Sequence, residues 1–341
     1  MTAARAWWQT APPPGPQLAS PFSTQLSSLS TIVWSDIFGD SSLPMTRAQA
    51  MAIPAIAKAR HVVAPKIAGY PIRAFDSDDV QLPDPLWAYR SNDGISPWHR
   101  MLWTIDDLIF TGFSLWEAFR GSEGQLLYAS RVGRDRWNIN ADYMIEVDGQ
   151  QVDAADFILI PGPHEGILTF ARVAIVQAAD LMRAAGNAAR TPSAHQELHQ
   201  TDGLPMDKTD IDELLAQYAE GRRGTNGGVS YTPPNIEVRD HGSIDSHLLV
   251  EGRNASAVDC ARVVGVAAGM VDATAPKASL NYETQEGRGL EHTEYGTEPY
   301  LEAVEARLSL DDVTARGTRC RFDKGDDLSP QPSPTGPSVQ D

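Results

Sequence analysis

The sequence predicts an α+β protein whose long helices pack against other copies of the same chain. A helix is followed by short strands joined by hairpin turns, instead of strands and helices that alternate. The longer helical segments carry narrow apolar stripes, too little surface for a core of their own. Hydrophobic residues make up 42% of the 341 residues and charged residues 21%, which indicates globular cores in about two to three domains. An ordinary α+β enzyme core has the same periodicity and stays open as an alternative.

Charge and cysteine content exclude several classes of protein. The formal net charge is −17 and the pI is about 4.8. A protein that binds nucleic acid tightly through the phosphate groups is usually basic, whereas this chain is acidic. Any contact that it makes with DNA must therefore be weak. Two cysteines, Cys260 and Cys320, without a secretion signal indicate free thiols in a reducing compartment. No window approaches the ~18 apolar residues of a membrane span.

Residues 1–43 are rich in Pro, Ser and Thr and lack the continuous apolar segment of a signal peptide. Trp7, Trp8 and Trp34 are among the scattered aromatic residues of this stretch. Isolated aromatic side chains in such a segment usually dock onto a neighbouring surface. We therefore expect an extended arm with few regular elements.

The first folded segment begins at a capping box in Thr46-Arg-Ala-Gln49, and a helix follows to about Ala68. Pro54 and Pro65 are expected to divide this helix into two pieces.

A second helix begins at Ser96-Pro97, where a capping residue precedes a proline in the first position. It carries a nearly ideal helical stripe, and hairpin strands follow it. Strands are expected at 71–75, 113–119, 126–132, 142–147 and 156–161, with an acidic loop at 76–84.

The second half of the chain predicts two long helices around a small α/β unit. One helix runs from about Ile167 to Ala189 and stops before Pro192. The other begins at Asp245 or Ser246. In the small unit we expect a helix from Asp207 or Thr209 to Gly224, and strands at 229–231 and 235–239. The returning helix is expected to end at Gly265 or Gly269, and a loop over 270–281 follows it. The last helix is expected to begin at Glu283 and to kink or restart at Pro299, and the tail after Phe322 is expected to be disordered.

Few residues suggest catalysis or metal binding. His195 and His199 lack the glutamate that a zinc-protease helix places directly after the first histidine, so both are interpreted as surface residues. His164-Glu165 has the residue types of an acid/base pair, but no nucleophile is evident nearby, and a structural turn is favoured. The adjacent pairs Asp106-Asp107 and Asp311-Asp312 diverge by about 100° on a helix and are interpreted as solvated faces.

Two further groups favour packing over ligand binding. Trp98, Trp103 and Trp116 lack the interleaved basic residues of a base-stacking platform and are expected in a core or an interface. Arg131, Arg134 and Arg136 form the densest basic cluster, and we expect them to pair with carboxylates of this chain or of a neighbouring subunit. No phosphate-binding loop and no nucleophile elbow occur in the sequence.

The order of these segments is similar to that of a known family. A helix and hairpin module ends in Phe157-Ile-Leu-Ile-Pro-Gly-Pro-His-Glu-Gly166, and an alanine-rich helix leads to the insert at 190–240. The returning helix carries Val250-Glu-Gly-Arg-Asn-Ala-Ser-Ala-Val-Asp259 and continues through Ala261-Arg-Val-Val-Gly-Val266. The last helix contains Asn281-Tyr-Glu283, Pro299 and Val304-Glu305.

Over about residues 46–322 this order resembles the portal proteins of long-tailed, siphophage-type bacteriophages, in the short form typical of phages of actinobacteria. Two stretches depart from the family pattern. Ala267-Ala268 stands where the family often has a proline pair, and Gly166-Ile-Leu-Thr169 where it often has Gly-x-Ser-Pro.

The resemblance implies a portal fold with an α/β wing, a two-helix stem, a small α/β clip and a minimal or absent crown. It implies a dodecameric ring at one capsid vertex, present in the virion and, during assembly, in the host cytoplasm. The implied parts are an N-terminal arm at 1–43, the first part of the wing at 44–166, a stem helix at 167–189, the clip at 190–242, a second stem helix at 243–269, a tunnel loop at 270–282, the second part of the wing at 283–322 and a disordered tail at 323–341.

The implied partners are the major capsid protein, the terminase large subunit of the packaging motor, the head–tail adaptor and double-stranded DNA that passes without sequence specificity. No cofactor, metal or membrane is implied, and the protein is not expected to be an enzyme. The alternatives are another head–tail structural protein of the virion, or a soluble hydrolase that uses His164 and Glu165. The implied site residues are Asp272, Thr274, Lys277, Ser279 and Asn281 in the DNA channel, Arg222, Arg223 and Asn226 in the clip, and Trp7, Trp8, Trp34, Arg131, Arg134 and Arg136 between subunits.

Overall fold

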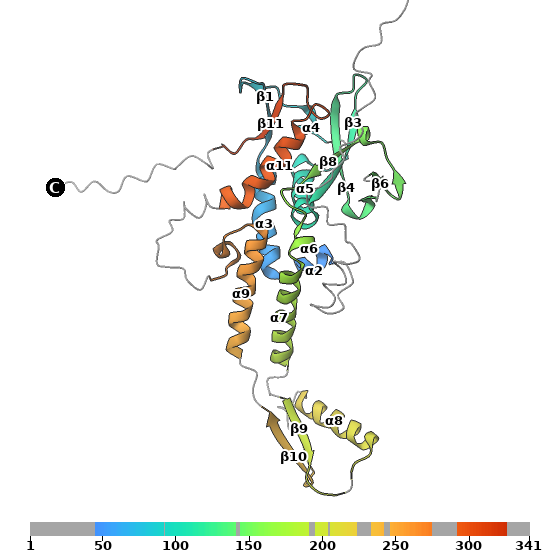
Figure 1. The fold of residues 1–341 in the computed structure, drawn as a ribbon, viewed down its shortest axis with the longest axis vertical. Coiled ribbons are helices and arrows are strands. Elements are labelled where there is room, and N and C mark those ends of the chain that lie inside the picture. The colour runs from blue at the N-terminus through green and yellow to red at the C-terminus, as the bar shows by residue number, and fades with distance from the viewer. Residues whose placement is uncertain are drawn as a thin grey trace, which may run out of the picture. The chain divides into compact units, whose positions relative to one another are not determined.

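The computed structural model describes residues 45–91, 93–140, 144–190, 195–203, 205–223, 233–241, 246–274 and 292–325. Helices and small antiparallel sheets make up these residues, which confirms the α+β class (Figure 1). The chain divides into two units, one holding the segments up to Ala179 and from Asn254 onward, the other Asp180–Arg253. The predicted arm, the strand at 229–231, the start of the last helix at 283–291 and most of the tail lie outside the described residues.

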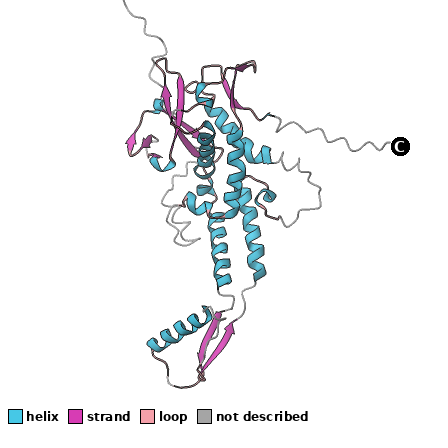
Figure 2. Ribbon diagram, turned by 180° about the vertical axis from the view of Figure 1, so that it is seen from behind, coloured by secondary structure: helices cyan, strands magenta, loops and turns pink. Residues whose placement is uncertain are grey.

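Helix α5 (Pro97–Thr111) is the centre of the first unit. Ser96 caps it as predicted, because its hydroxyl accepts a hydrogen bond from the His99 amide at 3.3 Å. The helix ends at Gly112, which adopts a left-handed conformation with φ of +79°. Ten of its fifteen residues are buried, so α5 is covered on almost every side. Helix α3 (Pro54–Gly69) lies beside it (Figures 1 and 2).

Helix α2 (Arg47–Met51) precedes α3 and has the predicted capping box. The break at Pro54 is confirmed, because α3 begins there. The second break was wrong: Pro65 lies inside α3 without ending it. Proline removes one backbone donor, but buried side chains on both sides of it, such as Val63 and Ile67, anchor the helix to the core.

Two three-stranded antiparallel sheets follow α5 in the sequence. In the first, β3 (Phe113–Arg120) lies between β4 (Leu126–Val132) and β8 (Phe157–Pro161), close to the predicted strands. In the second sheet, the strand predicted at 142–147 is shorter than expected. The other two strands of this sheet were not predicted, because runs of two or three residues are too short to show an alternating pattern. The strands of this sheet are β5 (Trp137–Ile139), β6 (Ile145–Val147) and β7 (Gln150–Gln151).

A third sheet joins the two ends of the described chain. Strand β1 (Ile72–Phe75) pairs with β2 (Gln81–Leu82), which lies within the predicted acidic loop, and with β11 (Arg319–Phe322). Helix α11 (Glu298–Leu308) packs on β11 and follows a π-helical turn at His292–Thr297. The predicted restart at Pro299 is therefore confirmed, since this proline lies in the first turn of α11.

The segment before the second unit was predicted as one helix and is two. Helix α6 (Ile167–Phe170) ends at Ala171, whose φ of −103° and ψ of 11° leave the helical region. Helix α7 (Arg172–Arg190) then continues into the second unit, and α9 (Ser246–Val264) returns from it. Helices α7 and α9 lie close together at Leu181 and Gly252. A Cβ atom added to Gly252 would lie 3.5 Å from a methyl carbon of the Leu181 side chain.

The second unit contains a strand that sequence reasoning missed. Strand β9 (His195–Gln200) pairs with β10 (Ile236–His241), which extends the predicted strand at 235–239. The polar run of β9 has no apolar alternation, so only its pairing identifies it as a strand. Helix α8 (Lys208–Arg223) begins directly after Asp207, as predicted.

Candidate functional site

The predicted channel loop begins in a well-anchored turn. Helix α9 ends in a Schellman motif at Gly265, which has a φ of +81°, as the sequence predicted. After a short 3₁₀ turn, Asp272 adopts a left-handed conformation, and its carboxylate lies 3.5 Å from the Lys58 ammonium of α3. Asn254 of α9 donates to the Thr274 carbonyl at 2.6 Å and accepts from the Thr274 amide at 2.9 Å.

These contacts hold the start of the loop against α3 and α9. Asp272 and Thr274 are both exposed at that start. The other three predicted channel residues, Lys277, Ser279 and Asn281, lie outside the described residues.

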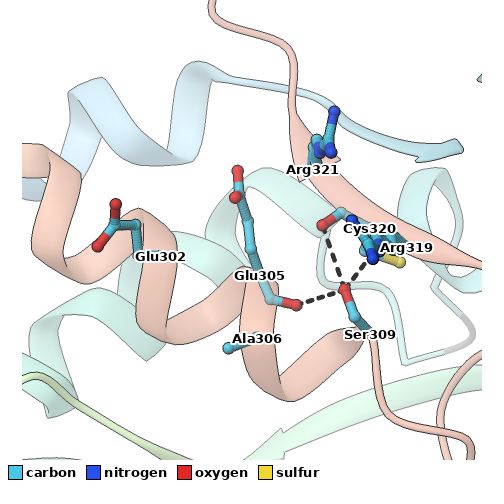
Figure 3. A pocket seen from close by; sticks show the side chains of 7 residues that line it. All are labelled: Glu302, Glu305, Ala306, Ser309, Arg319, Cys320 and Arg321. Atoms are coloured by element: carbon cyan, nitrogen blue, oxygen red, sulfur yellow. Dashed lines mark hydrogen bonds between the residues drawn. The ribbon is translucent and has the colours of Figure 1, made fainter. Parts of the chain in front are cut away.

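Helix α11 covers the outer edge of β11 (Figure 3). The Ser309 hydroxyl accepts a hydrogen bond from the Cys320 amide at 2.9 Å, and a Glu305 carboxylate oxygen accepts one from the Phe322 amide at 2.8 Å. An edge strand whose outward amides are satisfied in this way is not open to pairing with another strand. A shallow hollow of about 390 Å³ lies here, lined by Glu302, Glu305, Ala306, Ser309, Arg319, Cys320 and Arg321.

The thiol in this hollow is not reactive. Burial raises the pKa of the Cys320 thiol to about 12, so the thiol is protonated at neutral pH and is a poor nucleophile. Burial also raises the pKa of Cys260 to about 11. Both thiols are free and buried.

Asp106 and Asp107 are buried, so their interpretation as solvated residues was wrong. The Asp106 carboxylate accepts from Arg47 at 2.5 and 2.9 Å and from Arg60 at 2.6 Å. Asp107 accepts from Arg131 at 2.6 and 2.7 Å. Adjacent residues on a helix point in different directions. On α5 both directions are covered, because Asp106 faces arginines of α2 and α3 and Asp107 faces an arginine of β4.

The arginine cluster pairs within the chain. Besides the Arg131–Asp107 pair, Arg136 contacts Asp148 at 2.5 Å in an exposed ion pair. Arg134 donates to the Trp137 carbonyl at 2.7 Å, and its guanidinium lies 4.5 Å from the Trp137 ring centroid. Carboxylate pairing was expected for all three, and the structure provides it for two.

His164 joins the loop after β8 to α11. Its Nε2 lies 2.8 Å from the Tyr300 hydroxyl, and its Nδ1 accepts a hydrogen bond from the Gly166 amide at 3.0 Å. Both ring nitrogens are therefore engaged inside the fold, which agrees with a structural turn. Burial lowers the pKa of His164 from its ordinary value of 6.5, although the neighbouring Glu165 opposes the shift.

This lowered pKa predicts a pH dependence of stability. As the pH falls through 6.5, His164 in the unfolded chain binds a proton, whereas His164 in the folded chain stays neutral to a lower pH. Protonation therefore favours the unfolded state, and the protein loses stability on acidification. His164→Gln is expected to lose less thermal stability than the unaltered protein between pH 7 and pH 5, measured as the change in Tm. His61→Gln, at an exposed position of α3, is the control and should keep the full pH dependence. An unchanged pH dependence in His164→Gln would contradict this role.

The predicted histidine pair lies on a strand. Four residues along β9 separate His195 from His199 by about 13 Å, too far to share one metal ion. Within the part of the chain that the structure describes, there is no cluster of three or more potential metal ligands. None of the described helices has the length and apolar character required to cross a bilayer.

Helix α8 places a partly apolar face on the surface of the second unit. Ile211 is 42% exposed and Leu215 is 50% exposed. Arg222 and Arg223 lie in the last turn of the helix, and Asn226 lies outside the described residues. Ile211 and Leu215 lie one helical turn apart, so they are neighbours on one face of α8.

Comparison with solved structures identifies the fold. The crystal structure of an HK97 family phage portal protein from Corynebacterium diphtheriae is 34% identical, with a TM-score of 0.72; the match covers 82% of this chain and 96% of that one. A chain of the virion of a native gene transfer agent particle is 16% identical, with a TM-score of 0.54; the match covers 87% of this chain and 89% of that one. A chain from the neck of an empty particle of this agent is 18% identical with a TM-score of 0.52, covering 86% and 88%.

The two gene transfer agent chains share the fold alone, whereas the Corynebacterium protein also shares a third of its sequence. No protein-family model and no curated protein matches the chain. The predicted resemblance is confirmed, because the identity extends over nearly the whole Corynebacterium protein. This chain belongs to the HK97 family of phage portal proteins.

Proposed function

We propose that copies of this chain form a dodecameric ring at one vertex of the phage capsid, through which double-stranded DNA is packaged and later ejected. The observation that carries the proposal is the 34% identity to an HK97 family portal protein over 96% of that protein. A chain of the same fold, with a TM-score of 0.51, comes from the neck of a native gene transfer agent particle computed with C12 symmetry. That symmetry agrees with a dodecamer.

The parts of the chain have separate roles in this ring. Residues 44–166 and 283–322 form the wing, and 167–189 and 243–269 form the two stem helices. Residues 190–242 form the clip, and 270–282 form the tunnel loop near the DNA. The anchoring of Asp272 and Thr274 on α3 and α9 supports this role, because it holds the start of the loop at a defined position.

The charge of the chain suits a channel. A net charge of −17 repels phosphate, so a duplex can slide along the wall without sequence-dependent stops. In the tunnel loop, small polar side chains at Thr274, Ser279 and Asn281 offer no deep contacts, and Lys277 supplies one phosphate contact per subunit.

The clip is proposed to bind the terminase large subunit during packaging and the head–tail adaptor afterwards. The exposed Ile211 and Leu215 of α8 support a docking role, together with Arg222, Arg223 and Asn226. The wing would contact the major capsid protein, and Trp7, Trp8, Arg134 and Arg136 would contribute to contacts between subunits. Arg131 is already paired with Asp107 inside its own chain. The ring would assemble in the host cytoplasm and remain in the virion.

Electron microscopy of the purified protein tests the proposal. The expected result is a ring with a central hole and twelvefold symmetry in class averages, with a native mass of a dodecamer. A monomer or small oligomer with a single closed pocket would overturn it. A ring whose subunits lack a clip between two stem helices would point to another head–tail structural protein.

Lys277→Glu is expected to leave ring assembly intact but to reduce DNA packaging or retention. The substitution replaces the one basic side chain of the loop with an acid, so the phosphate contact becomes repulsion in every subunit. Packaged DNA per particle, protected from nuclease, is the measurement. Lys277→Arg keeps the charge and should package normally. If Lys277→Glu packages as well as Lys277→Arg, the loop does not lie at the constriction.

A further inference from the structure

Three aromatic rings form an exposed strip on α5, the helix that is otherwise buried. The Trp98 and His99 rings are 4.9 Å apart between centroids, and the His99 and Trp103 rings are 5.8 Å apart. Trp98 is 40% exposed, His99 is exposed and Trp103 is half-buried. We call Trp98, His99 and Trp103 the aromatic strip. Neighbouring exposed aromatic rings on the central helix of a unit are typical of a binding site.

The chain enters the fold on the same face of α5. Arg47, two residues after the first described residue, contacts Asp106, and its guanidinium lies 5.3 Å from the Phe110 ring centroid. Spacings of three or four residues place side chains on the same face of a helix. One face of α5 therefore carries His99, Trp103, Asp106 and Phe110 in succession. The seven residues from Asp106 to His99 span only about 10 Å along the helix.

The sequence before this entry point contains a segment suited to the strip. Residues 32–38 read Ile-Val-Trp-Ser-Asp-Ile-Phe and hold five large apolar side chains in a stretch otherwise rich in Pro, Ser and Thr. Phe38 precedes Arg47 by nine residues, which reach about 30 Å when extended. The segment is therefore long enough to reach every ring of the strip.

We propose that residues 32–38 of the same chain dock onto the aromatic strip. The short tether gives the segment a high effective concentration at the strip, so it is favoured over a free partner of equal intrinsic affinity. Trp34, Ile37 and Phe38 supply aromatic and aliphatic surface that matches exposed rings. Trp34 then stabilises its own subunit and is not part of a contact between subunits. The proposal does not depend on the ring or on DNA.

Disulfide trapping in the full-length protein tests this contact. The Ser35→Cys/His99→Cys variant places one thiol in the segment and one in the strip, while both tryptophans of the strip remain. The native Cys260 and Cys320 are buried, so they react slowly with a mild oxidant. The expected product is an intrachain disulfide between positions 35 and 99, identified by peptide mass.

Two pairs of arm substitutions are compared in this variant. Trp34→Ser/Phe38→Ser removes the anchors and should slow disulfide formation about tenfold or more, because the effective concentration of the two thiols falls. Trp7→Ser/Trp8→Ser removes two aromatic side chains from the same arm and should leave the rate unchanged. None of the four positions belongs to the buried core of the described residues.

Three outcomes would overturn the proposal. One is the absence of an intrachain disulfide. Another is an equal rate in the two pairs of arm variants, which would show that the tether alone brings the thiols together. The third comes from mixing Ser35→Cys chains with His99→Cys chains: an interchain disulfide formed as fast as the intrachain one would show that the segment docks on a neighbouring copy.

Discussion

Replacing Gly166 with alanine is expected to prevent the first unit from folding. Gly166 has a φ of +87° and a ψ of 140°, a conformation that is strained for any residue with a side chain. An added Cβ would also lie 2.4 Å from the Thr111 carbonyl carbon and 2.5 Å from the Phe110 oxygen. Both contacts are with backbone at the end of α5, which cannot move without breaking that helix. The free energy of unfolding should fall by about 4 kcal/mol or more.

The measurement is the yield of soluble protein together with its unfolding in urea. Gly186→Ala is the matched control, because nothing lies within 4 Å of the added Cβ and the residue is in the exposed interior of α7. This control should gain about 0.5 to 1 kcal/mol, the usual advantage of alanine over glycine in a helix. If Gly166→Ala folds as well as Gly186→Ala, the close approach between the loop and α5 is not required.

The second large effect is expected for Asp106→Asn. This carboxylate is 8% exposed and neutralises Arg47 of α2 and Arg60 of α3, of which Arg60 is only 15% exposed. Removing its charge leaves a buried arginine without compensation, which typically costs about 3 to 5 kcal/mol. The unfolding midpoint in urea should fall accordingly, without a change in the slope of the transition.

Asp148→Asn provides the control for this substitution. Asp148 and Arg136 form a comparable short ion pair, but both side chains are 56% exposed, and solvent screens such pairs. Its unfolding midpoint should match that of the unaltered protein within error. Equal midpoints for Asp106→Asn and Asp148→Asn would show that the buried pair contributes nothing to holding α2 and α3 on α5.

The elements that the sequence predicted best are those determined by local chemistry. A capping serine, a following proline and a continuous stripe predict α5, and all three act within one or two helical turns. Gly265 ends α9 because a left-handed position follows directly from the absence of a side chain. The ordered set of such elements was enough to indicate the portal family.

The errors arose where a residue depends on distant partners. The burial of Asp106 is decided by arginines 46 and 59 positions away, which no helical periodicity reveals. Strand β9 depends on β10, about 40 residues later, and not on its own polar sequence. The three tryptophans were predicted in a core or an interface; which of them is buried, as Trp116 is, and which is exposed, as Trp98 is, is a property of the folded unit.

The pairing of β1 with β11 has a consequence for biosynthesis. Ile72 pairs with Phe322, and Arg73 and Asp323 share a hydrogen bond across 250 residues of chain. At about 5 to 20 residues per second, a ribosome needs about 12 to 50 seconds to translate that interval. During this time the nascent chain exposes the edge of β1 that its partner strand will later cover. A translation product truncated before Arg319 cannot complete this sheet.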